Sequence, residues 1–338
     1  MADRVTIVDV AARAGVAISS VSSALNGRPG VSEATRARIV KAADELGFVP
    51  SLRGRSLSGK KAFAVGLVVH RDPDVLELDP FFASFIGGIE SHIDGPGFAL
   101  VLQIGSDPGE MLDRYRRLAA DNRVDGVFLS ELETDDPRVP LVRELGLPAV
   151  GINAEPGFSM PVVRQDHEAG IRALVSHLVD GGHTRIAFVG GPRHFIHSAQ
   201  RERAWRDAVE SHGLTPGRFV EGGFTYAGGA DAADTLLSGG ERPTAVLCAN
   251  DLSAIGFMSE AAHLGFEVPR DISVAGYDGI QLGAYVHPAL TTITTSPRRL
   301  GFEAARMLLE LIDGRRVPDT VIEPAELLVR ASTGPVSD

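Results

Sequence analysis

Short hydroxyl side chains near the amino terminus occur at a spacing that suits contact with DNA. In the stretch TIVDVAARAGVAISSVSSALN, Ser19, Ser22 and Ser23 share with Ile18 the outward side of a predicted helix. Hydroxyl groups donate to and accept from base edges, and an apolar side chain can contact the thymine methyl group. These residue types at this spacing predict a recognition helix for the major groove.

Two predicted helices and a glycine turn position these side chains. Thr6 as N-cap and Asp9 as its acidic partner in a capping box begin the first helix. Gly15 ends that helix, because a sharp turn often needs a positive φ, and Val16 can seal the corner between the helices. The second helix is expected over about residues 17–25.

A third predicted helix completes a module of about fifty residues. Ser32 is its candidate N-cap, Glu33 suits the positive end of the helix dipole, and Gly47 is expected to end it. Its inward side is predicted to carry Val40, Ala43 and Leu46. A helical hairpin with a purely structural role is the alternative interpretation.

The distribution of charge favours DNA binding over that alternative. Residues 1–61 contain ten Lys and Arg and five Asp and Glu, a net charge of +5, whereas the whole chain carries −11 and the remainder therefore −16. A basic amino-terminal segment on an acidic protein is typical of phosphate binding confined to one module.

The segment TIVDVAARAGVAISSVSSALNGRPGVSEATRARIVKAADELGFVPSLRGRSL resembles the headpiece of the lactose/galactose repressor (LacI/GalR) family of bacterial transcription regulators, and the resemblance extends over nearly the whole chain. It implies that Ile18, Ser19 and Ser23 choose the bases. Phosphate contacts, which set the register without reading the sequence, are implied for Thr6, Ser20, Ser22, Asn26 and Thr35. Ala17 replaces the family's usual capping Ser or Thr and is counted with these DNA-binding residues.

Residues 49–61 resemble the family's hinge, which folds into a helix when two subunits meet on an operator. The resemblance implies that Leu57 wedges into the minor groove and kinks the duplex, and Arg55 lies in the same DNA-binding segment. Gly54 replaces the usual hinge Ala and lowers helix propensity by roughly 1 kcal/mol. Off DNA, PSLRGRSLSGKK is expected to be a basic, flexible linker.

Eight apolar runs predict the rest of the fold. They are FAVGLVV, FALVLQI, VDGVFLS, PAVGIN, RIAFVGG, FVEGGF, TAVLCAN and ISVAGYD, and amphipathic helix patterns separate them. This alternation is typical of parallel sheets flanked by helices, whose strands are apolar throughout because both faces are buried. The two sets of four predict two Rossmann-like lobes, which form a periplasmic-binding-protein-like α/β core behind the three-helix helix-turn-helix headpiece.

The expected domain boundaries follow from these patterns. The headpiece covers residues 1–48, the hinge 49–61, the two-lobed core 62–330 and a short disordered tail 331–338. The resemblance implies three crossovers between the lobes, near residues 153–161, 291–295 and 321–324. Lobe 1 is then about 62–157 plus 293–321, and lobe 2 about 158–292 plus 322–330. The lobes are expected to hinge around a central cleft.

Polar and aromatic residues follow several of the apolar runs, at the strand ends where open α/β sheets bind ligands. Asn153 and Asn250 end two of these runs, and a plain turn role is an equal alternative for Asn153. The resemblance implies effector contacts for Phe81, Arg201, Phe224 and Asp278. Phe82 either joins this set or packs at the start of its helix, and a surface ion pair is the alternative for Arg201. Asp251 is expected to cap a helix.

The combination of an Asp, two Asn, an Arg and aromatic rings around one cleft suits a neutral polyol. Carboxylate and amide groups bind hydroxyls, and rings cover the apolar faces of a sugar. A sugar or sugar derivative is therefore the expected effector. A purine or a phosphorylated metabolite is the alternative, because Arg201 can hold an anion.

The sequence lacks the motifs that are typical of enzymes. GxGxxG in a strand-turn-helix unit and GxxxxGK[ST] are absent, and no nucleophile–base or paired-carboxylate arrangement is found, so no catalytic residue and no cofactor are predicted. His194 and His197 have no third ligand nearby and are expected to line a loop or cleft rather than hold a metal. The single cysteine, Cys248, excludes an intramolecular disulfide and lies in a predicted buried strand.

A periplasmic solute-binding protein shares the two-lobed architecture and is the main alternative function. The sequence shows no charged-then-apolar leader and no apolar run of the roughly eighteen residues needed to span a bilayer, so a cytoplasmic protein without a membrane partner is expected. We predict a ligand-responsive transcription factor, a repressor, that binds a pseudo-palindromic double-stranded operator as a homodimer. A tetramer is less favoured because no heptad-like apolar helix follows Arg330.

Overall fold

The computed structural model describes residues 5–25, 29–48, 61–71, 79–105 and 107–336. Four residues that the sequence assigns to the hinge or to DNA contacts lie outside the described residues, namely Asn26, Gly54, Arg55 and Leu57. The chain divides into two compact units, Met1–Phe63 and Ala64–Asp338.

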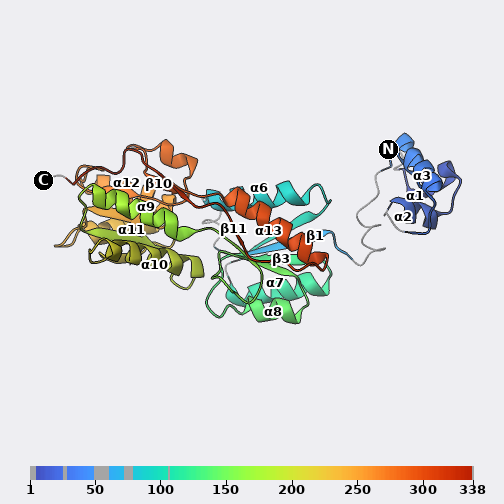
Figure 1. The fold of residues 1–338 in the computed structure, drawn as a ribbon, viewed down its shortest axis with the longest axis horizontal. Helices are drawn as coiled ribbons and strands as arrows, with labels where there is room; N and C mark the ends of the chain where they lie inside the picture. Colours follow the sequence, from blue (N-terminus) through green and yellow to red (C-terminus); the bar gives the residue numbers. More distant parts are fainter. Residues whose placement is uncertain (1–4, 26–28, 49–60, 72–78, 106, 337–338) are drawn as a thin grey trace. The chain divides into compact units, whose positions relative to one another are not determined.

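The first unit is helical (Figure 1), and its helices pack around a small apolar core. They are α1 (Ile7–Ala14), α2 (Ile18–Leu25) and α3 (Glu33–Leu46). Each helix places one fully buried side chain in the core, and these are Val10, Val21 and Ile39. The bend of 102° between α1 and α2 is that of a helix-turn-helix.

Local sequence signals define the ends of these helices as predicted. Thr6 and Asp9 form the capping box of α1, and Gly15 ends the helix with a φ of 63°. The Ser32 hydroxyl caps α3, and Gly47 ends it with a φ of 64°. The turn residues therefore need glycine for its left-handed conformation.

The predicted inward position of Val40 is wrong. Val40 is 42% exposed, and Ile39, one position earlier, is buried instead. The inward side of α3 also carries Ala42 and Ala43, three and four positions after Ile39. This spacing follows the helical period and turns Val40 toward solvent.

No single helix among the described residues is both long and apolar enough to cross a membrane. Only α1 and α2 together meet that length and composition, as a pair with a sharp bend.

The second unit contains two parallel sheets, each covered by helices on both faces (Figure 1). The first sheet has the strand order β11-β5-β4-β3-β1-β2. Its strands are β1 (Ala64–His70), β2 (Ala99–Gly105), β3 (Gly126–Leu129), β4 (Ala149–Ile152), β5 (Val162–Arg164) and β11 (Thr320–Val321). One face is covered by α6 (Pro80–Ile93) and α13 (Pro297–Ile312), the other by α7 (Pro108–Ala120) and α8 (Arg138–Glu144).

The second sheet has the strand order β7-β6-β8-β9. Its strands are β6 (Ile186–Gly190), β7 (Phe219–Glu221), β8 (Ala245–Cys248) and β9 (Ser273–Ala275). One face is covered by α9 (His167–Asp180) and α10 (Ile196–Ser211), the other by α11 (Tyr226–Leu237) and α12 (Asp251–His263). A short 3-10 helix, η1 (Gln281–Ala284), follows β9. All eight predicted runs form strands, and Cys248 is fully buried in β8.

Three crossovers connect lobe 1, built on the first sheet, with lobe 2, built on the second. Because β5 pairs with β4 and β11, it belongs to lobe 1, and the chain first crosses at residues 165–166. The expected crossover at residues 153–161 is therefore wrong, since that segment joins β4 to β5 within one sheet. The other crossovers, at residues 295–296 and 322–325, adjoin the antiparallel pair β10 (Thr292–Thr294) and β12 (Glu326–Leu328).

The expectation of a disordered tail is wrong for residues 331–336, which pack on lobe 2. Ser332 is fully buried, its hydroxyl donates to the Val274 carbonyl at 2.6 Å, and it accepts from the Thr291 N–H at 2.8 Å. The Gly334 N–H donates to the Ser273 hydroxyl at 3.0 Å. These partners lie on β9 and just before the segment Thr292–Thr294, 41 to 61 residues earlier in the chain, so the short polar segment gives no sign of them.

Candidate functional site

A cavity lies between the two lobes at the carboxyl ends of their strands, where open α/β sheets bind ligands. It holds about 510 Å³ of space between protein atoms, including its open mouth. Lobe 1 contributes Arg71, Asp79, Phe81, Phe82, Ser130, Glu131, Ile152 and Asn153. Lobe 2 contributes His197, Arg201, Phe224, Asn250 and Asp278. All seven residues predicted to contact an effector therefore lie around one cavity.

Four of these residues have a backbone conformation that residues other than glycine rarely adopt. The φ values of Glu131, Asn153, Phe224 and Asp278 are 51°, 55°, 63° and 114°. Each lies within three residues of the carboxyl end of a strand. Elsewhere in the described chain only three non-glycine residues have a positive φ. Because strain of this kind, about 1–3 kcal/mol per residue, gathers at ligand sites, it makes this cavity the candidate ligand site.

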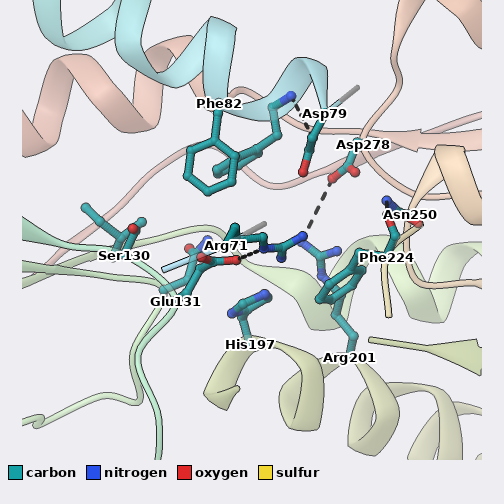
Figure 2. A pocket seen from close by; sticks show the side chains of 13 residues that line it. Arg71, Asp79, Phe82, Ser130, Glu131, His197, Arg201, Phe224, Asn250 and Asp278 are labelled. Atoms are coloured by element: carbon teal, nitrogen blue, oxygen red, sulfur yellow. Dashed lines mark hydrogen bonds and ion pairs between the residues drawn. The ribbon is translucent and has the colours of Figure 1, made fainter. Parts of the chain in front are cut away.

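Arg201 is buried in the lobe 2 wall, so the surface ion pair considered from sequence is wrong. Its Nη1 donates to the Ala249 carbonyl at 2.5 Å, and its Nη2 lies 3.9 Å from Asp278 Oδ1 (Figure 2). The guanidinium carbon lies 4.0 Å from the centre of the Tyr277 ring and 5.7 Å from that of Phe224. These contacts hold the charged group at the cavity wall in one orientation.

An ion pair between Arg71 and Glu131 forms part of the lobe 1 wall (Figure 2). Both side chains are at most one-tenth exposed. The Arg71 guanidinium carbon also lies 5.5 Å from the centre of the Phe224 ring and 5.8 Å from that of Phe195, both in lobe 2. The ion pair of lobe 1 therefore also contacts aromatic faces of lobe 2.

Aromatic side chains give the cavity its apolar surface. The Phe81 ring meets Phe82 edge to face at 5.5 Å and stacks on Phe85 at 5.9 Å. The His197 ring stacks on Phe224 at 5.5 Å. Burial lowers the pKa of His197 well below its usual value, so the imidazole is neutral at neutral pH. The side chain of Phe82 lines the cavity and also packs in the lobe 1 core. The two alternatives considered from sequence, a place in the ligand site and packing at the start of a helix, are therefore compatible.

Burial raises the pKa of the three carboxyl groups that line the cavity. For Asp79, Glu131 and Asp278 the loss of hydration is the largest cause, and Arg71 and Arg201 lower the pKa values only in part. Asp79 in addition caps α6 by accepting from the Phe81 N–H at 3.0 Å. The cavity thus contains paired charges and neutral polar groups rather than a cluster of cations.

The expected capping role of Asp251 is wrong, because its neighbour Asn250 caps α12. Asn250 Oδ1 accepts from the Ser253 N–H at 3.1 Å, and Nδ2 donates to the Phe224 carbonyl at 2.9 Å. Asp251 is fully buried and accepts from the Ile280 N–H at 2.7 Å and the Thr292 hydroxyl at 2.5 Å. Asp251 thereby joins lobe 2 to β10, next to a crossover.

Gln165 connects the cavity wall to all three crossovers. It lies in the first crossover, and its backbone N–H donates to Asn153 Oδ1 at 2.9 Å. Its side-chain Nε2 donates to the Glu323 carbonyl of the third crossover at 2.6 Å, and Oε1 accepts from the Ser296 N–H of the second at 3.5 Å. One buried side chain thus contacts both other crossing segments.

The predicted recognition helix α2 presents its amino-terminal end to solvent. Ile18 is 48% exposed, and Ala17 and Ser19 are exposed as well. Farther along the helix the hydroxyl residues are half-buried, and these are Ser20, Ser22 and Ser23. An exposed amino-terminal end is what a recognition helix needs for base contact.

Thr6 and Thr35 lie in the first turns of α1 and α3, where backbone N–H groups attract phosphate. Thr6 Oγ1 donates to Asp9 Oδ2 at 2.7 Å, and this bond is the largest cause of the lowered pKa of Asp9. Thr35 Oγ1 accepts from the Ser32 hydroxyl at 2.9 Å. Both hydroxyl groups therefore also stabilise helix starts.

Comparison with known proteins agrees with this architecture. The family described as bacterial regulatory proteins, lacI family, matches residues 6–51, and a periplasmic binding protein-like domain matches residues 175–333. The HTH-type transcriptional repressor PurR of Vibrio vulnificus is 36% identical over 334 residues, covering 96% of this chain and 97% of the repressor. The chain belongs to the lacI family. It is a ligand-responsive, DNA-binding transcriptional regulator similar to the PurR repressors.

Solved structures of lacI-family proteins match the full length of the chain. The lac repressor dimer bound to operator and the anti-inducer ONPF has a TM-score of 0.82 and 28% identity, covering 98% of this chain and 100% of that one. The transcriptional regulator CelR in complex with cellobiose has a TM-score of 0.74 and 30% identity, covering 97% of this chain and 100% of that one. The predicted fold of headpiece and two-lobed core is confirmed.

Several cavity residues of this lacI-family protein were not singled out from its sequence, and these are Arg71, Ser130, Glu131 and Ile152. Neither Asp79 nor His197 was assigned to a ligand, and His197 was expected to line a loop or cleft. Arg71 directly follows β1, and Ser130 and Glu131 directly follow β3. The strand-end rule that selected Asn153 would have selected these residues too.

Proposed function

We propose that this regulator binds a neutral, hydroxyl-rich ligand of the saccharide class in the interlobe cavity, and that the ligand changes its affinity for an operator. The residues we assign to the ligand are Phe81, Phe82, Asn153, Arg201, Phe224, Asn250 and Asp278. We assign the protein no catalytic role, since its relatives are transcriptional repressors.

The observation that carries this proposal is that each of the two arginines in the described cavity wall faces a carboxyl group. Arg71 is paired with Glu131, and Arg201 is bonded to the Ala249 carbonyl and faces Asp278. A phosphorylated ligand would need a cation to replace its hydration, and it would meet buried carboxyl groups. Hydroxyl groups, in contrast, can donate to carboxyl and amide oxygens and accept from N–H groups.

The aromatic residues support a saccharide in particular. Phe81, Phe82 and Phe224 present apolar rings beside the polar groups, which suits the apolar faces of a pyranose. The similarity to the CelR–cellobiose complex over nearly the full chain agrees with this class of ligand. The planar rings would also stack on a purine base, so purines serve as the comparison ligands in the test.

On the DNA side we propose a cytoplasmic homodimer on a pseudo-palindromic operator. Its two headpieces would read matching half-sites, as two-fold symmetry requires. Base contacts are assigned to Ile18, Ser19 and Ser23. Phosphate contacts are assigned to Thr6, Ser20, Ser22, Asn26 and Thr35. Leu57 is assigned to the minor groove, and Ala17 and Arg55 complete the set of DNA-binding residues.

The test is isothermal titration of the full-length protein with neutral mono- and disaccharides, cellobiose among them, beside sugar phosphates and purine bases. We expect binding by at least one neutral saccharide and none by the phosphates. Fluorescence anisotropy with an operator selected from random duplexes should then give a different operator affinity with that saccharide present. Binding by a purine or a phosphate alone would overturn the proposed ligand class.

A further inference from the structure

The loop after β3 leaves two buried polar atoms of the cavity wall without partners. Glu131 Oε2 and Ser130 Oγ have no hydrogen-bond partner among the described residues, and both side chains line the cavity. Arg201 Nε, on the opposite wall, shares this property. Buried polar atoms are normally paired, so three orphaned atoms around one cavity call for an explanation in terms of what the cavity binds.

Only one of the two carboxylate oxygens of Glu131 has a partner among the described residues. Its Oε1 pairs with Arg71, while Oε2 is buried and free of partners among the described residues. A carboxylate oxygen is an acceptor only, so the group that would satisfy it must be a donor. A hydroxyl fits, because the charge of Glu131 is already balanced by Arg71.

The loop that carries Glu131 is built to hold it in place. The buried Arg138 donates from Nη1 to the Ser130 carbonyl at 2.9 Å and from Nη2 to the Glu131 carbonyl at 2.8 Å. Asp136 holds Arg138 in turn, with Oδ1 accepting from Nε at 2.9 Å. This clamp holds Glu131 at its strained φ of 51°.

Given the proposed saccharide ligand, on which this role rests, we propose that Glu131 is a specificity-determining residue of the cavity. Its Oε2 accepts a hydrogen bond from one ligand hydroxyl, with Ser130 Oγ beside it available to a neighbouring hydroxyl. Arg71 favours the ionised form of the Glu131 carboxyl and orients it through their ion pair, and Arg138 is a positioning residue that acts through the loop backbone. The lobe 1 wall therefore selects a saccharide with a hydroxyl at one defined ring position.

The main test is a double-mutant cycle by isothermal titration. Wild-type protein and the variant Glu131→Gln are titrated with the tightest-binding saccharide of the panel and with analogues in which single hydroxyls are replaced by hydrogen. In the wild type, one analogue should bind about ten- to a hundred-and-fifty-fold more weakly than the parent, as for loss of a hydrogen bond to a charged group. In Glu131→Gln that ratio should shrink at least about threefold.

Glu303→Gln is the matched control. Glu303 is as buried as Glu131 and is paired with Arg299 and Arg306 on α13, but it does not line the cavity. We expect wild-type saccharide affinity and a wild-type ratio for this variant. Glu131→Gln with an unchanged ratio, or with the same loss for every analogue, overturns the role of Glu131 alone. A wild-type protein that binds no saccharide of the panel overturns both this role and the proposed function.

A second measurement separates a ligand-binding pair from a purely structural one without any ligand. The double variant Arg71→Met/Glu131→Gln removes both charges, so neither is left unpaired. Buried ion pairs replaced by neutral groups of similar size are often neutral or stabilising. We expect a thermal midpoint within a few degrees of the wild type. A fall of more than about 10 °C, equivalent to several kcal/mol in a protein of this size, would show that the pair serves the fold and would overturn the proposal.

Discussion

Asn153 Oδ1 accepts a hydrogen bond from the Gln165 backbone N–H at 2.9 Å, which joins the wall of the cavity to the first crossover between the lobes. Lobe closure requires rotation at the three crossovers, and hinges are usually a few residues that absorb such rotation. The Gln165 side chain bonds to both other crossovers. A change at Asn153 on ligand binding therefore acts on a residue that all three crossovers share.

We expect Gln165→Ala to weaken the coupling between ligand and operator while leaving the ligand contacts in place. Saccharide affinity should change less than about threefold, whereas the saccharide-induced change in operator affinity should shrink at least fivefold, since coupling energies are typically 1–3 kcal/mol. Operator titrations by anisotropy, with and without saccharide, measure both. The control is Gln103→Ala, a half-buried glutamine on β2 that does not line the cavity. If Gln165→Ala and Gln103→Ala show the same saccharide-induced change in operator affinity, Gln165 has no role in the coupling.

The buried carboxyl of Asp251 should make stability depend on pH. Burial raises its pKa from the ordinary value of 3.8 to about 7. Between these values the folded state binds more protons than the unfolded chain, so this group lowers the free energy of unfolding as the pH rises from about 4 to 7. The predicted loss is on the order of 4 kcal/mol.

The substitution Asp251→Asn should remove this pH-dependent decrease in the free energy of unfolding. We expect the free energy of unfolding of the variant, relative to the wild type, to increase as the pH rises through this range. Urea unfolding at several pH values between about 4.5 and 7.5 measures the difference. A difference that stays constant with pH would mean that Asp251 is ionised throughout.

The crossing of α6 and α13 depends on a glycine. A Cβ atom at Gly88 would lie 2.0 Å from the Arg298 carbonyl oxygen, whereas a Cβ atom at Gly87 would meet open space. Gly88→Ala should therefore lower the free energy of unfolding by about 3 kcal/mol through overpacking. Gly87→Ala, on the same helix, should leave it unchanged or raise it by up to about 1 kcal/mol. Similar urea midpoints for the two variants would contradict the close approach.

The features that sequence predicted well depend on neighbouring residues. The capping box of Thr6 and Asp9 and the left-handed Gly15 are local, and all three are as expected. Six of the eight apolar strands are buried on both faces, which made them recognisable, whereas the edge strands β2 and β7 are only partly buried. Val40 was misplaced because a shift of one residue turns a helix by about 100° and so moves a side chain off the inward side.

The features that sequence missed depend on distant partners. β5 is only three residues long and was unrecognised, because its place in lobe 1 comes from pairing with β4 and with β11, more than 150 residues later. Arg71 and Glu131 are 60 positions apart, and only the sheet brings them together. The burial of Ser332 likewise rests on Val274. Such contacts follow from tertiary packing, which local patterns do not report.

Replacement of Asp278 should change ligand binding and stability in opposite directions. Asn is the suitable replacement, because it tolerates a positive φ such as the 114° of Asp278 and keeps an acceptor oxygen. Burial raises the pKa of Asp278 well above its usual value of 3.8, so this group lowers the free energy of unfolding as the pH rises above that value. We expect Asp278→Asn to unfold at an equal or higher temperature, to bind the saccharide about tenfold or more weakly, and to bind the operator without ligand like the wild type. Scanning calorimetry measures the unfolding temperature, and the saccharide and operator titrations measure the two affinities. Arg201→Ala is a second variant, which we expect to lose the saccharide-induced change in operator affinity. If Asp278→Asn keeps full saccharide affinity, the carboxylate serves the fold, and the ligand contacts lie elsewhere in the cavity.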